Sequence, residues 1–298
     1  MDRVLVTGHS GFTGRHLVDH LRSIGGEVSG FDRSDGGDIR DSAALDRVLR
    51  ATRPTVVYHL AGVLKSEDPQ EFYSVNVLGT VALLDALVQL GWRTRVVIVS
   101  SSAVYGRTRS GGRVSERAPL RPRTHYGASK LAQEQVGMRY VNARLLPVVR
   151  ARPFNLLGPG LPTSLAAGAF VDSIARLERT PAPPSLRTGN LTPIRDFVDV
   201  RDAVRAYRLI AERGRSGAAY NVSSGTGVSI QRCLDVLLGL ATRPIRSELD
   251  AAKIQTDDVD AQVGDFGRLH ALTGWKPAIR LERSLSDMLE HRRRTAPT

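Results

Sequence analysis

The chain has 298 residues, and its 42 Lys and Arg against 30 Asp and Glu give it a formal charge of +12. This length suffices for one large or two modest domains with a full core, and 41% hydrophobic residues with 28 Gly and 15 Pro exclude a disordered or collagen-like chain. The one cysteine, Cys233, excludes an internal disulfide and a cysteine-rich zinc site, and we expect no metal centre.

The positive charge comes almost entirely from arginine. Only four lysines stand against 38 arginines, and the arginines are spread along the whole chain. This skew is typical of a coding bias, so the charge favours small phosphorylated anions as ligands over nucleic acid. We expect the arginine run at 292–294 to form a solvated tail.

We expect a cytoplasmic protein. A strand that begins at Val4 leaves no room for a secretory leader. The stretch 154–171, which carries no charged side chain, contains two prolines and three glycines, which argues against a membrane helix.

Apolar strand patterns alternate with helical patterns through the first half of the chain. Strands are expected at 4–6, 28–31, 56–58, 96–99 and 148–151, and helices after 12 and at 42–50, 70–90 and 126–141. This alternation predicts an α/β fold with a Rossmann-type, doubly wound parallel sheet over residues 1–160. After Pro159, loops and shorter helices predict a smaller α/β substrate-binding domain over 161–298, with about 195–228 returning to the first domain.

Three glycines spaced three apart join the first strand to the first helix. Three glycines alone can form an ordinary turn, but between a strand and a helix they are typical of a loop that holds the pyrophosphate of a dinucleotide. The residues expected to contact such a cofactor here are Gly8, Ser10, Gly11, Phe12, Thr13 and Gly14.

Asp32 ends the second strand, where a carboxylate can accept hydrogen bonds from the adenosine ribose. Because this carboxylate would repel a 2′-phosphate, Asp32 favours NAD(H), while the neighbouring Arg33 keeps NADP(H) open. Further along the chain we expect Asp38 and Ile39 beside the adenine ring, and Leu60, Ala61 and Gly62 beside the cofactor.

Tyr126 and Lys130 are four residues apart and therefore share one face of a predicted helix. A tyrosine can protonate a developing alkoxide, and a nearby ammonium is expected to lower the tyrosine pKa from its usual value of about 10. Ser101 follows the fourth strand, so its hydroxyl can hydrogen-bond a substrate oxygen; a polar turn is the alternative for the serines at 100–102. Asn76 is either a surface amide of a helix or the holder of a water near the lysine.

Motifs in both halves resemble extended short-chain dehydrogenase/reductases that act on nucleotide sugars. In the first half these are the segments 7–14, 58–62, 76–80, 100–106 and 126–130. The segments 152–160, 189–191, 195–202, 220–225 and 273–277 are similar to the GDP-6-deoxy-D-mannose reductase subgroup. The resemblance runs from about residue 2 to residue 290.

The resemblance implies a catalytic set of Ser101, Tyr126 and Lys130. It also implies that Asn76 and Pro153 lie at the cofactor, together with the catalytic tyrosine and lysine. The residues expected at the substrate are Ser101 and Ser102 near the sugar, Asn155 and Arg195 near the nucleotide diphosphate, Phe170 and Val171 near the base, and Arg187.

The chain departs from the subgroup at two places. Leu156 stands where the subgroup carries His, and Gln255-Thr256, with Lys253 nearby, stand where it carries Arg-Pro. Related reductases act on dTDP-linked 4-keto-6-deoxyhexoses, so the nucleotide stays open between GDP and dTDP. The pair Ser102-Ala103 lacks the carboxylate that sugar dehydratases carry after the catalytic hydroxyl, which argues against dehydration. Epimerisation at C3 or C5 would need a cysteine as acid or base, and Cys233 lies far downstream of the catalytic strand, which argues against that reaction.

The predicted function is that of an NAD(P)-dependent oxidoreductase of deoxysugar biosynthesis. In this prediction a hydride passes to C4 of a nucleotide-linked 4-keto-6-deoxyhexose, and Tyr126 acts as the general acid. An NAD-dependent nucleotide-sugar 4-epimerase is the alternative, and a non-catalytic nucleotide-sensing protein is a minor one. The expected partner is a nucleotide sugar, with no nucleic acid and no membrane.

The helix expected at 70–90 carries a broad apolar stripe. Its members are Val77, Val81, Leu84 and Val88, widened by Leu78 and Leu87. One sheet can cover only part of so broad a surface, although packing of the whole stripe on the sheet is the alternative. We therefore expect a two-fold homodimer built from this helix and the helix at 126–141.

Overall fold

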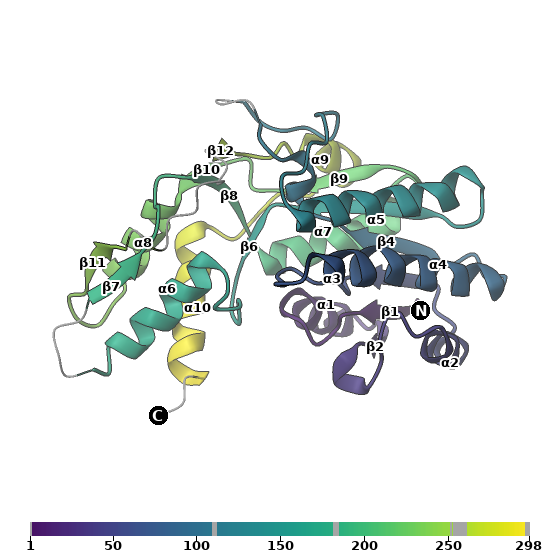
Figure 1. Ribbon diagram of the computed structural model, residues 1–298, viewed down its shortest axis with the longest axis horizontal. Helices are drawn as coiled ribbons and strands as arrows, with labels where there is room; N and C mark the ends of the chain where they lie inside the picture. Colours follow the sequence, from purple (N-terminus) through teal and green to yellow (C-terminus); the bar gives the residue numbers. More distant parts are fainter. Residues whose placement is uncertain (1, 109–111, 181–184, 251, 253–260, 296–298) are drawn as a thin grey trace.

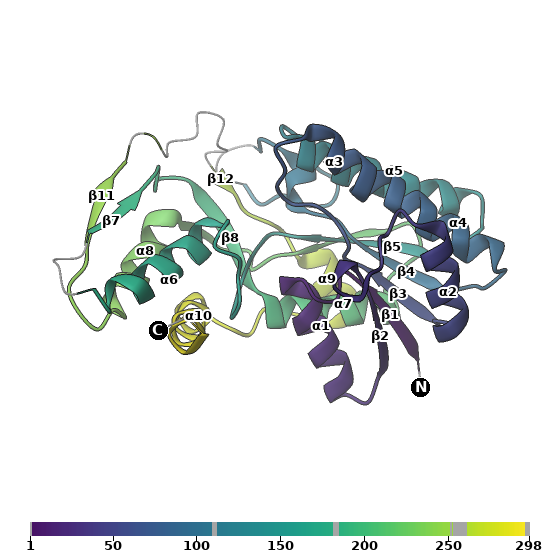
Figure 2. The same ribbon diagram turned by 60° about the horizontal axis from the view of Figure 1, so that its bottom comes forward.

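A computed structural model of the protein describes residues 2–108, 112–180, 185–250, 252 and 261–295. It has two parts, a large layered domain that holds the N-terminus and a smaller domain that holds the C-terminal helix (Figures 1 and 2). The positions 253–256, where the chain departs from the related subgroup, include Lys253, Gln255 and Thr256, which lie outside the described residues.

The large domain alternates strands and helices along the chain. Its elements are β1 (Arg3–Thr7), α1 (Phe12–Ser23), β2 (Glu27–Phe31), η1 (Arg33–Asp35), α2 (Ser42–Thr52), β3 (Val56–His59), α3 (Pro69–Tyr73), η2 (Ser74–Leu78), α4 (Gly79–Gln89), β4 (Arg95–Val99), η3 (Ser102–Tyr105), α5 (His125–Asn142) and β5 (Val148–Pro153). Each helix and strand expected from the sequence in this half is present.

A six-stranded parallel sheet, in the order β2-β1-β3-β4-β5-β9, forms the middle layer. Strand order reverses at β1, which pairs with β2 on one side and β3 on the other, so the sheet is doubly wound. The predicted fold class is confirmed. The crevice at such a reversal, outside the carboxyl ends of the strands, is where this architecture binds ligands.

Both faces of the sheet are buried, as the uncharged strands require. Val97 and Val99 of β4 face α1 (Phe12–Ser23), α7 (Val200–Arg213) and α9 (Gly267–Thr273), whereas Val96 and Ile98 face α2, α4 and α5. Figure 2 shows these two helical layers on opposite sides of the strands. Alternate residues of one strand therefore supply two separate cores.

The segment Pro69–Gln89 is one continuous helical rod with a π-helical turn, η2, in its middle. By length and composition alone this segment could cross a membrane, but half of its apolar window is buried in the fold. Leu83, Leu84 and Leu87 are fully buried against α2 and the sheet. The α4 part of the segment therefore contributes to the core.

Among its described residues, the smaller domain contains two short sheets and three helices. Its elements are β6 (Asn155–Leu157), α6 (Ala166–Leu177), β7 (Ser185–Thr188), β8 (Ile194–Asp199), β10 (Gly227–Ser229), α8 (Ile230–Gly239), β11 (Arg246–Leu249), β12 (Ala261–Gln262) and α10 (Leu281–Thr295). Strand β8 pairs with β6, β10 and β12, and β7 pairs with β11. The buried Asp196 carboxylate on β8 accepts four hydrogen bonds, from the Ser224 hydroxyl and from the amides of Ser224, Gly225 and Gly264.

Three elements after residue 160 return to the large domain. Helix α7 packs on α1 and the sheet, β9 (Ala219–Val222) pairs with β5, and α9 packs against β9 and α7. The return thus begins at Val200, because β8 belongs to the smaller domain. It also includes α9, which lies beyond the 195–228 segment expected from the sequence.

The expectation of a solvated tail at 292–294 is wrong. Helix α10 runs through this segment, and the Arg292 Nε lies 2.8 Å from the Asp172 carboxylate. Arg293 Nε lies 2.9 Å from Glu178. Arg292 and Arg293 therefore form ion pairs with acidic residues of α6 and of the C-terminal cap of α6. These pairs hold α10 against α6 in the smaller domain.

Candidate active site

Two connected cavities open at the carboxyl ends of the central strands. The larger has a volume of about 520 Å³ and the smaller about 260 Å³. They share a wall formed by Gly8, Gly11, Leu60, Gly62 and Val63. One extended ligand can therefore occupy both cavities by passing over the glycine-rich turn.

The glycine-rich turn has no room for side chains. Gly8 has φ +72°, a left-handed conformation that favours glycine. A Cβ on Gly14 would lie 2.1 Å from the Gly8 carbonyl oxygen, which shows how closely α1 approaches the turn. Gly11 caps α1 without a side-chain hydrogen bond, and Phe12 and Thr13 of its first turn line the larger cavity. This cradle fits the pyrophosphate of a dinucleotide, which would bind at the helix N-terminus.

Asp32 stands at the mouth of the smaller cavity with both carboxylate oxygens held in place. One oxygen accepts the Ser10 backbone N–H at 2.7 Å, and the other accepts the Ser34 N–H at 2.7 Å and the Ser34 hydroxyl at 2.6 Å. Burial acts to raise the pKa of Asp32, but these hydrogen bonds outweigh burial and lower it to about 2. Asp32 is therefore a fixed negative charge at neutral pH.

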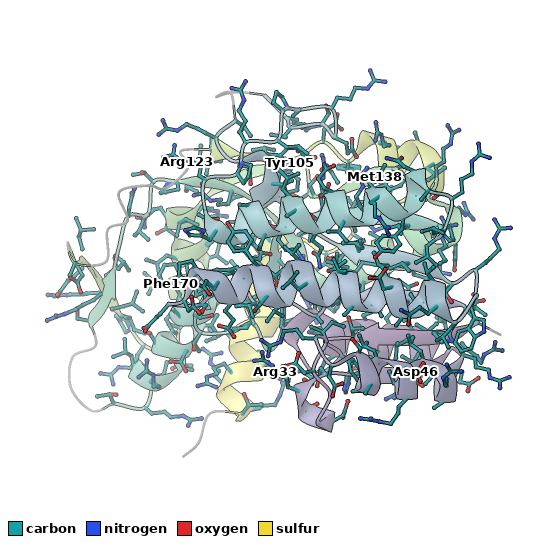
Figure 3. The ribbon with its side chains drawn as sticks, turned by 45° about the vertical axis from the view of Figure 1, so that its right-hand side comes forward. Arg33, Asp46, Tyr105, Arg123, Met138 and Phe170 are labelled. Carbon is teal, nitrogen blue, oxygen red and sulfur yellow. The ribbon has the colours of Figure 1, made fainter. Side chains whose placement is uncertain are left out.

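The other residues expected around the adenosine also lie at this smaller cavity. Arg33, Asp38, Ile39 and Ala61 line it. The Arg33 guanidinium lies 4.0 Å from Asp38 and 3.9 Å from Glu71, so it is drawn toward acidic side chains. Figure 3 labels Arg33 below the rod formed by α3 and α4.

The structure brings Ser101, Tyr126 and Lys130 together on the wall of the larger cavity. Tyr126 and Lys130 come from the first two turns of α5, whose N-cap Thr124 accepts the Gly127 N–H at 3.0 Å. Ser101 caps η3, and a Cβ on Gly127 would lie 2.8 Å from the Ala103 carbonyl oxygen. This glycine lets α5 approach η3 closely enough for the Ser101 hydroxyl to hydrogen-bond Tyr126.

The expectation that Lys130 lowers the pKa of Tyr126 is wrong for this structure. Burial raises the pKa of Tyr126, and the hydrogen bond with Ser101 only partly opposes that effect. Burial also lowers the pKa of Lys130 to about 8, although the negative charge of Glu134 acts in the opposite direction. Desolvation thus outweighs the charges at both residues, and Tyr126 is a protonated donor near neutral pH.

A buried hydrogen-bonded chain stands behind Lys130. The Thr7 hydroxyl lies 2.8 Å from Nδ1 of His59, and Nε2 of His59 lies 2.8 Å from the Thr80 hydroxyl. Gln133 donates to the same Thr80 oxygen at 2.8 Å. Burial, aided by the charge of Lys130, lowers the pKa of His59 to about 3. This neutral histidine ties the end of β1 to the helices that carry the catalytic face.

Asn76 has a different place from the one expected. Its side chain accepts the Val63 N–H at 2.7 Å and donates to the Ser129 hydroxyl at 2.9 Å. It is fully buried and lines neither cavity. The amide bonds Val63 and Ser129, so Asn76 fixes the Gly62–Val63 wall against α5.

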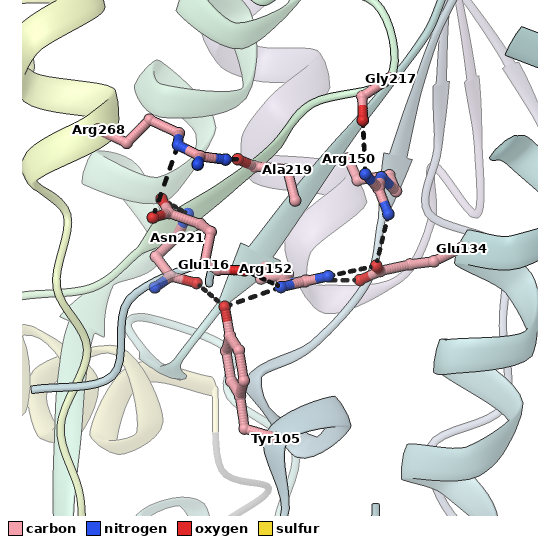
Figure 4. Close-up of polar contacts among 9 residues, drawn as sticks. All are labelled: Tyr105, Glu116, Glu134, Arg150, Arg152, Gly217, Ala219, Asn221 and Arg268. Carbon is pink, nitrogen blue, oxygen red and sulfur yellow. Dashed lines mark hydrogen bonds and ion pairs between the residues drawn. The ribbon is translucent and has the colours of Figure 1, made fainter. Parts of the chain in front are cut away.

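Behind the catalytic helix lies a buried ionic network (Figure 4). Arg152 donates to both carboxylate oxygens of Glu134, at 2.8 Å and 2.7 Å, and Arg150 adds a contact of 3.1 Å. Arg152 also donates to the Tyr105 hydroxyl at 3.0 Å, which in turn donates to Asn221 on β9 at 2.6 Å. The network therefore joins α5, which carries Tyr126 and Lys130, to β5, η3 and β9.

The residues expected at the substrate divide into two groups. Ser101, Ser102, Asn155 and Arg195 line the larger cavity, as do Pro153, which is expected at the cofactor, and Leu156, which replaces the histidine of the related subgroup. Phe170 and Val171 do not: they are buried in the core of the smaller domain, because α6 turns that face toward α8 and α10. Arg187 is exposed on β7 and lines neither cavity.

Several cavity residues were not predicted from the sequence. They are Arg123, Thr124, Phe154, Leu161, Pro162, Leu165, Tyr207 and Gln262. Arg123, labelled in Figure 3, and Thr124 lie three and two residues before Tyr126, so their position in the chain could have indicated them. Gln262 carries no such signal, because the pairing of β12 with β8 places it beside Arg195.

The chain matches the NAD dependent epimerase/dehydratase family over residues 4–223. It is 32% identical over 292 residues to the GDP-6-deoxy-D-mannose reductase of Pseudomonas aeruginosa, and the match covers 96% of each chain. Two solved structures share this fold over nearly the whole chain. RMD from Pseudomonas aeruginosa complexed with NADPH has a TM-score of 0.91 at 31% identity, covering 99% of both chains. The UDP-glucose 4-epimerase of Thermus thermophilus in complex with NAD has a TM-score of 0.87 at 29% identity, covering 99% of this chain and 100% of that one.

Proposed function

The chain belongs to the NAD dependent epimerase/dehydratase family, and we propose that it is a 4-ketoreductase of nucleotide-linked 4-keto-6-deoxyhexoses. The observation that carries this proposal is the convergence of Ser101, Tyr126 and Lys130 on one cavity beside the glycine-rich cradle. The 32% identical relative that is named as a GDP-6-deoxy-D-mannose reductase supports the substrate class.

The proposal gives each catalytic side chain a task in this reaction. A bound reduced nicotinamide supplies the hydride to C4 of the sugar. As the oxygen at C4 gains negative charge, Tyr126 donates its proton to that oxygen and Ser101 hydrogen-bonds it. The raised pKa of Tyr126 keeps the proton on the phenol until charge develops. Lys130, at the floor of the same cavity, supplies a positive charge that supports the phenolate left behind.

The wall of the larger cavity offers no carboxyl group for acid or base catalysis among the described residues. Ser102, Ala103 and Leu165 form part of this wall, and no Asp or Glu of the described residues belongs to it. A dehydratase of this family would need a carboxyl acid or base beside the catalytic hydroxyl. The wall therefore supports reduction over dehydration.

The decisive experiment measures consumption of NADH and NADPH by the purified protein against GDP- and dTDP-linked 4-keto-6-deoxy sugars. The proposal expects loss of reduced cofactor in step with formation of the 6-deoxyhexose. Interconversion of a nucleotide sugar with its 4-epimer, with tightly held NAD and no net cofactor consumption, would instead establish the 4-epimerase. The 4-epimerase with a TM-score of 0.87 makes this the second candidate.

We further propose that NADH is preferred over NADPH. The fixed charge of Asp32 stands where the adenosine ribose would lie, and it would repel a 2′-phosphate. We expect a higher kcat/KM with NADH than with NADPH. The variant Asp32→Ala should show a smaller ratio between these two values. A clear preference for NADPH would mean that Arg33, on the same cavity wall, governs the choice instead.

A further inference from the structure

Of the tyrosines that line the larger cavity among the described residues, Tyr207 carries a hydroxyl without a hydrogen-bond partner. Tyr207, on α7, is fully buried and belongs to the wall of this cavity. Its phenolic oxygen makes no hydrogen bond to any described residue. By contrast, the equally buried hydroxyls of Tyr105 and Tyr140 each donate to a side-chain oxygen at 2.6 Å.

Burying a hydroxyl without a hydrogen bond in an apolar core lowers the stability of the fold. A tyrosine at this position therefore needs a compensating interaction. Phenylalanine would fill the same space among Val99, Ala203 and Val204 without a stranded polar atom. The hydroxyl therefore either bonds an internal water or is one half of a hydrogen bond that a ligand completes. Its place on the cavity wall favours the ligand.

The position of Tyr207 identifies which part of a dinucleotide it would meet. It lines the larger cavity with Tyr126 and Pro153 and is absent from the smaller cavity, where Asp32 stands. The charge of an ionised Tyr126 would raise the pKa of Tyr207, so the two phenols lie within electrostatic range of each other. The ring that delivers hydride must approach the carbon whose oxygen meets Tyr126. The nicotinamide half therefore occupies the larger cavity, and the adenosine half occupies the smaller one.

We propose that the Tyr207 hydroxyl is a positioning group for the cofactor that hydrogen-bonds the nicotinamide half in the bound state. This inference rests on the proposed function, since it requires that the chain bind a nicotinamide dinucleotide. Burial holds the pKa of Tyr207 far above its usual value, so the phenol stays neutral. A neutral phenol can both donate and accept, which suits the carboxamide and ribose hydroxyl groups of that half.

The test compares the variant Tyr207→Phe with Tyr220→Phe. Tyr220 is buried in the same core, but its hydroxyl already accepts the Arg215 N–H at 3.0 Å and lies away from both cavities. Two quantities are measured for each protein. The first is the midpoint of thermal unfolding, with and without cofactor. The second is the Kd for whichever of NADH and NADPH the wild type binds more tightly.

Tyr207→Phe should unfold at the same or a higher temperature than the wild type without cofactor, because the stranded hydroxyl is gone. Its Kd for the dinucleotide should rise by about three- to tenfold, the usual worth of one hydrogen bond. Its Kd for ADP-ribose, which lacks the nicotinamide, should not change. Tyr220→Phe should show the reverse pattern, with lower stability and an unchanged Kd.

Three outcomes would overturn the inference while leaving the reductase intact. They are an unchanged dinucleotide Kd in Tyr207→Phe, an equal loss of ADP-ribose affinity, and a loss of stability without cofactor that matches that of Tyr220→Phe. Failure of the proposed function has different signatures: a 4-epimerase would bind the dinucleotide without net consumption of reduced cofactor, and a protein without the proposed cofactor site would bind neither NADH nor NADPH, in the wild type as well as in the variants.

Discussion

At the scale of single residues, desolvation decides the protonation states of the site. Tyr126 and Lys130 are both withdrawn from water, and burial outweighs the nearby charges in each case. The result is a protonated phenol beside a lysine whose pKa of about 8 lies close to neutrality. A proton donor and a titratable ammonium side by side suit the protonation of an alkoxide.

Replacing Tyr126 with Phe should lower turnover by at least about 100-fold, the usual contribution of a positioned general acid. Cofactor affinity should change little, because the ring remains and only the hydroxyl is lost. Steady-state kcat and a separate cofactor Kd check the two parts. Retained turnover in this variant would remove Tyr126 from the mechanism.

Cofactor affinity should fall as the pH rises through about 8. Below that pH Lys130 is an ammonium that attracts the ribose hydroxyls and the anionic diphosphate, and above it the side chain becomes neutral. Titration of the cofactor Kd from about pH 6.5 to about pH 9.5 provides the measurement. Lys130→Arg, whose charge does not titrate in this range, should flatten the profile, and Lys130→Met should lower both affinity and turnover. A wild-type profile that is already flat would contradict this role.

At the scale of elements, close contacts between backbones set the shape of the site. Gly14 lets α1 rest on the glycine-rich turn, and Gly127 lets α5 rest on η3. The catalytic helix is also held from behind by the buried pair of Glu134 and Arg152. Each of these contacts joins a helix to a loop or strand at the carboxyl edge of the sheet, so small local changes should disturb the cavity as a whole.

Gly14→Ala should lower the free energy of unfolding by roughly 2 kcal/mol or more and abolish cofactor binding. The new Cβ would lie 2.1 Å from the Gly8 carbonyl oxygen and 2.7 Å from the His9 backbone, and neither neighbour can rotate away. Urea unfolding and a cofactor titration measure the two effects. Gly239→Ala at the end of α8 is the control, since no atom lies within 4 Å of its new Cβ and stability should hold or rise slightly.

Arg152→Met should destabilise the protein by about 3 to 5 kcal/mol, because it leaves the buried Glu134 carboxylate without its bidentate partner. The midpoint of urea unfolding is the measurement. Arg50→Ala, which breaks the exposed pair with Asp46, should leave that midpoint unchanged. Equal effects in the two variants would show that the buried network adds nothing to stability.

At the scale of the whole molecule, the rod formed by α3, η2 and α4 presents two different faces. Leu84 and Leu87 are fully buried against the sheet, whereas Leu78 is 61% exposed and Tyr73 is 38% exposed. The stripe expected from the sequence is therefore divided between the core and the surface. Figure 1 shows the rod lying beside α5 on one side of the molecule.

We propose that this face joins two copies of the chain. Light scattering at micromolar concentration should give about twice the chain mass of 32.4 kDa. Leu78→Glu should shift the mass to that of a monomer without loss of folding, because a charge on this exposed apolar residue would be buried in the dimer. Leu249→Glu, on the distant strand β11, should remain dimeric even though Leu249 is 69% exposed. A wild-type mass equal to that of one chain would exclude the dimer.

The sequence alone determined the doubly wound sheet, the glycine-rich turn and the grouping of Ser101, Tyr126 and Lys130. These features depend on local rules, since the period of the apolar residues fixes each element and the strand ends collect at one edge of a parallel sheet. The tertiary structure alone decided the rest. It placed Tyr207 and Gln262 on the cavity wall through the packing of α7 and the pairing of β12, turned Phe170 into a core, and set the pKa of Tyr126 by burial. Such outcomes depend on contacts between residues far apart in the chain, and local periodicity carries no information about them.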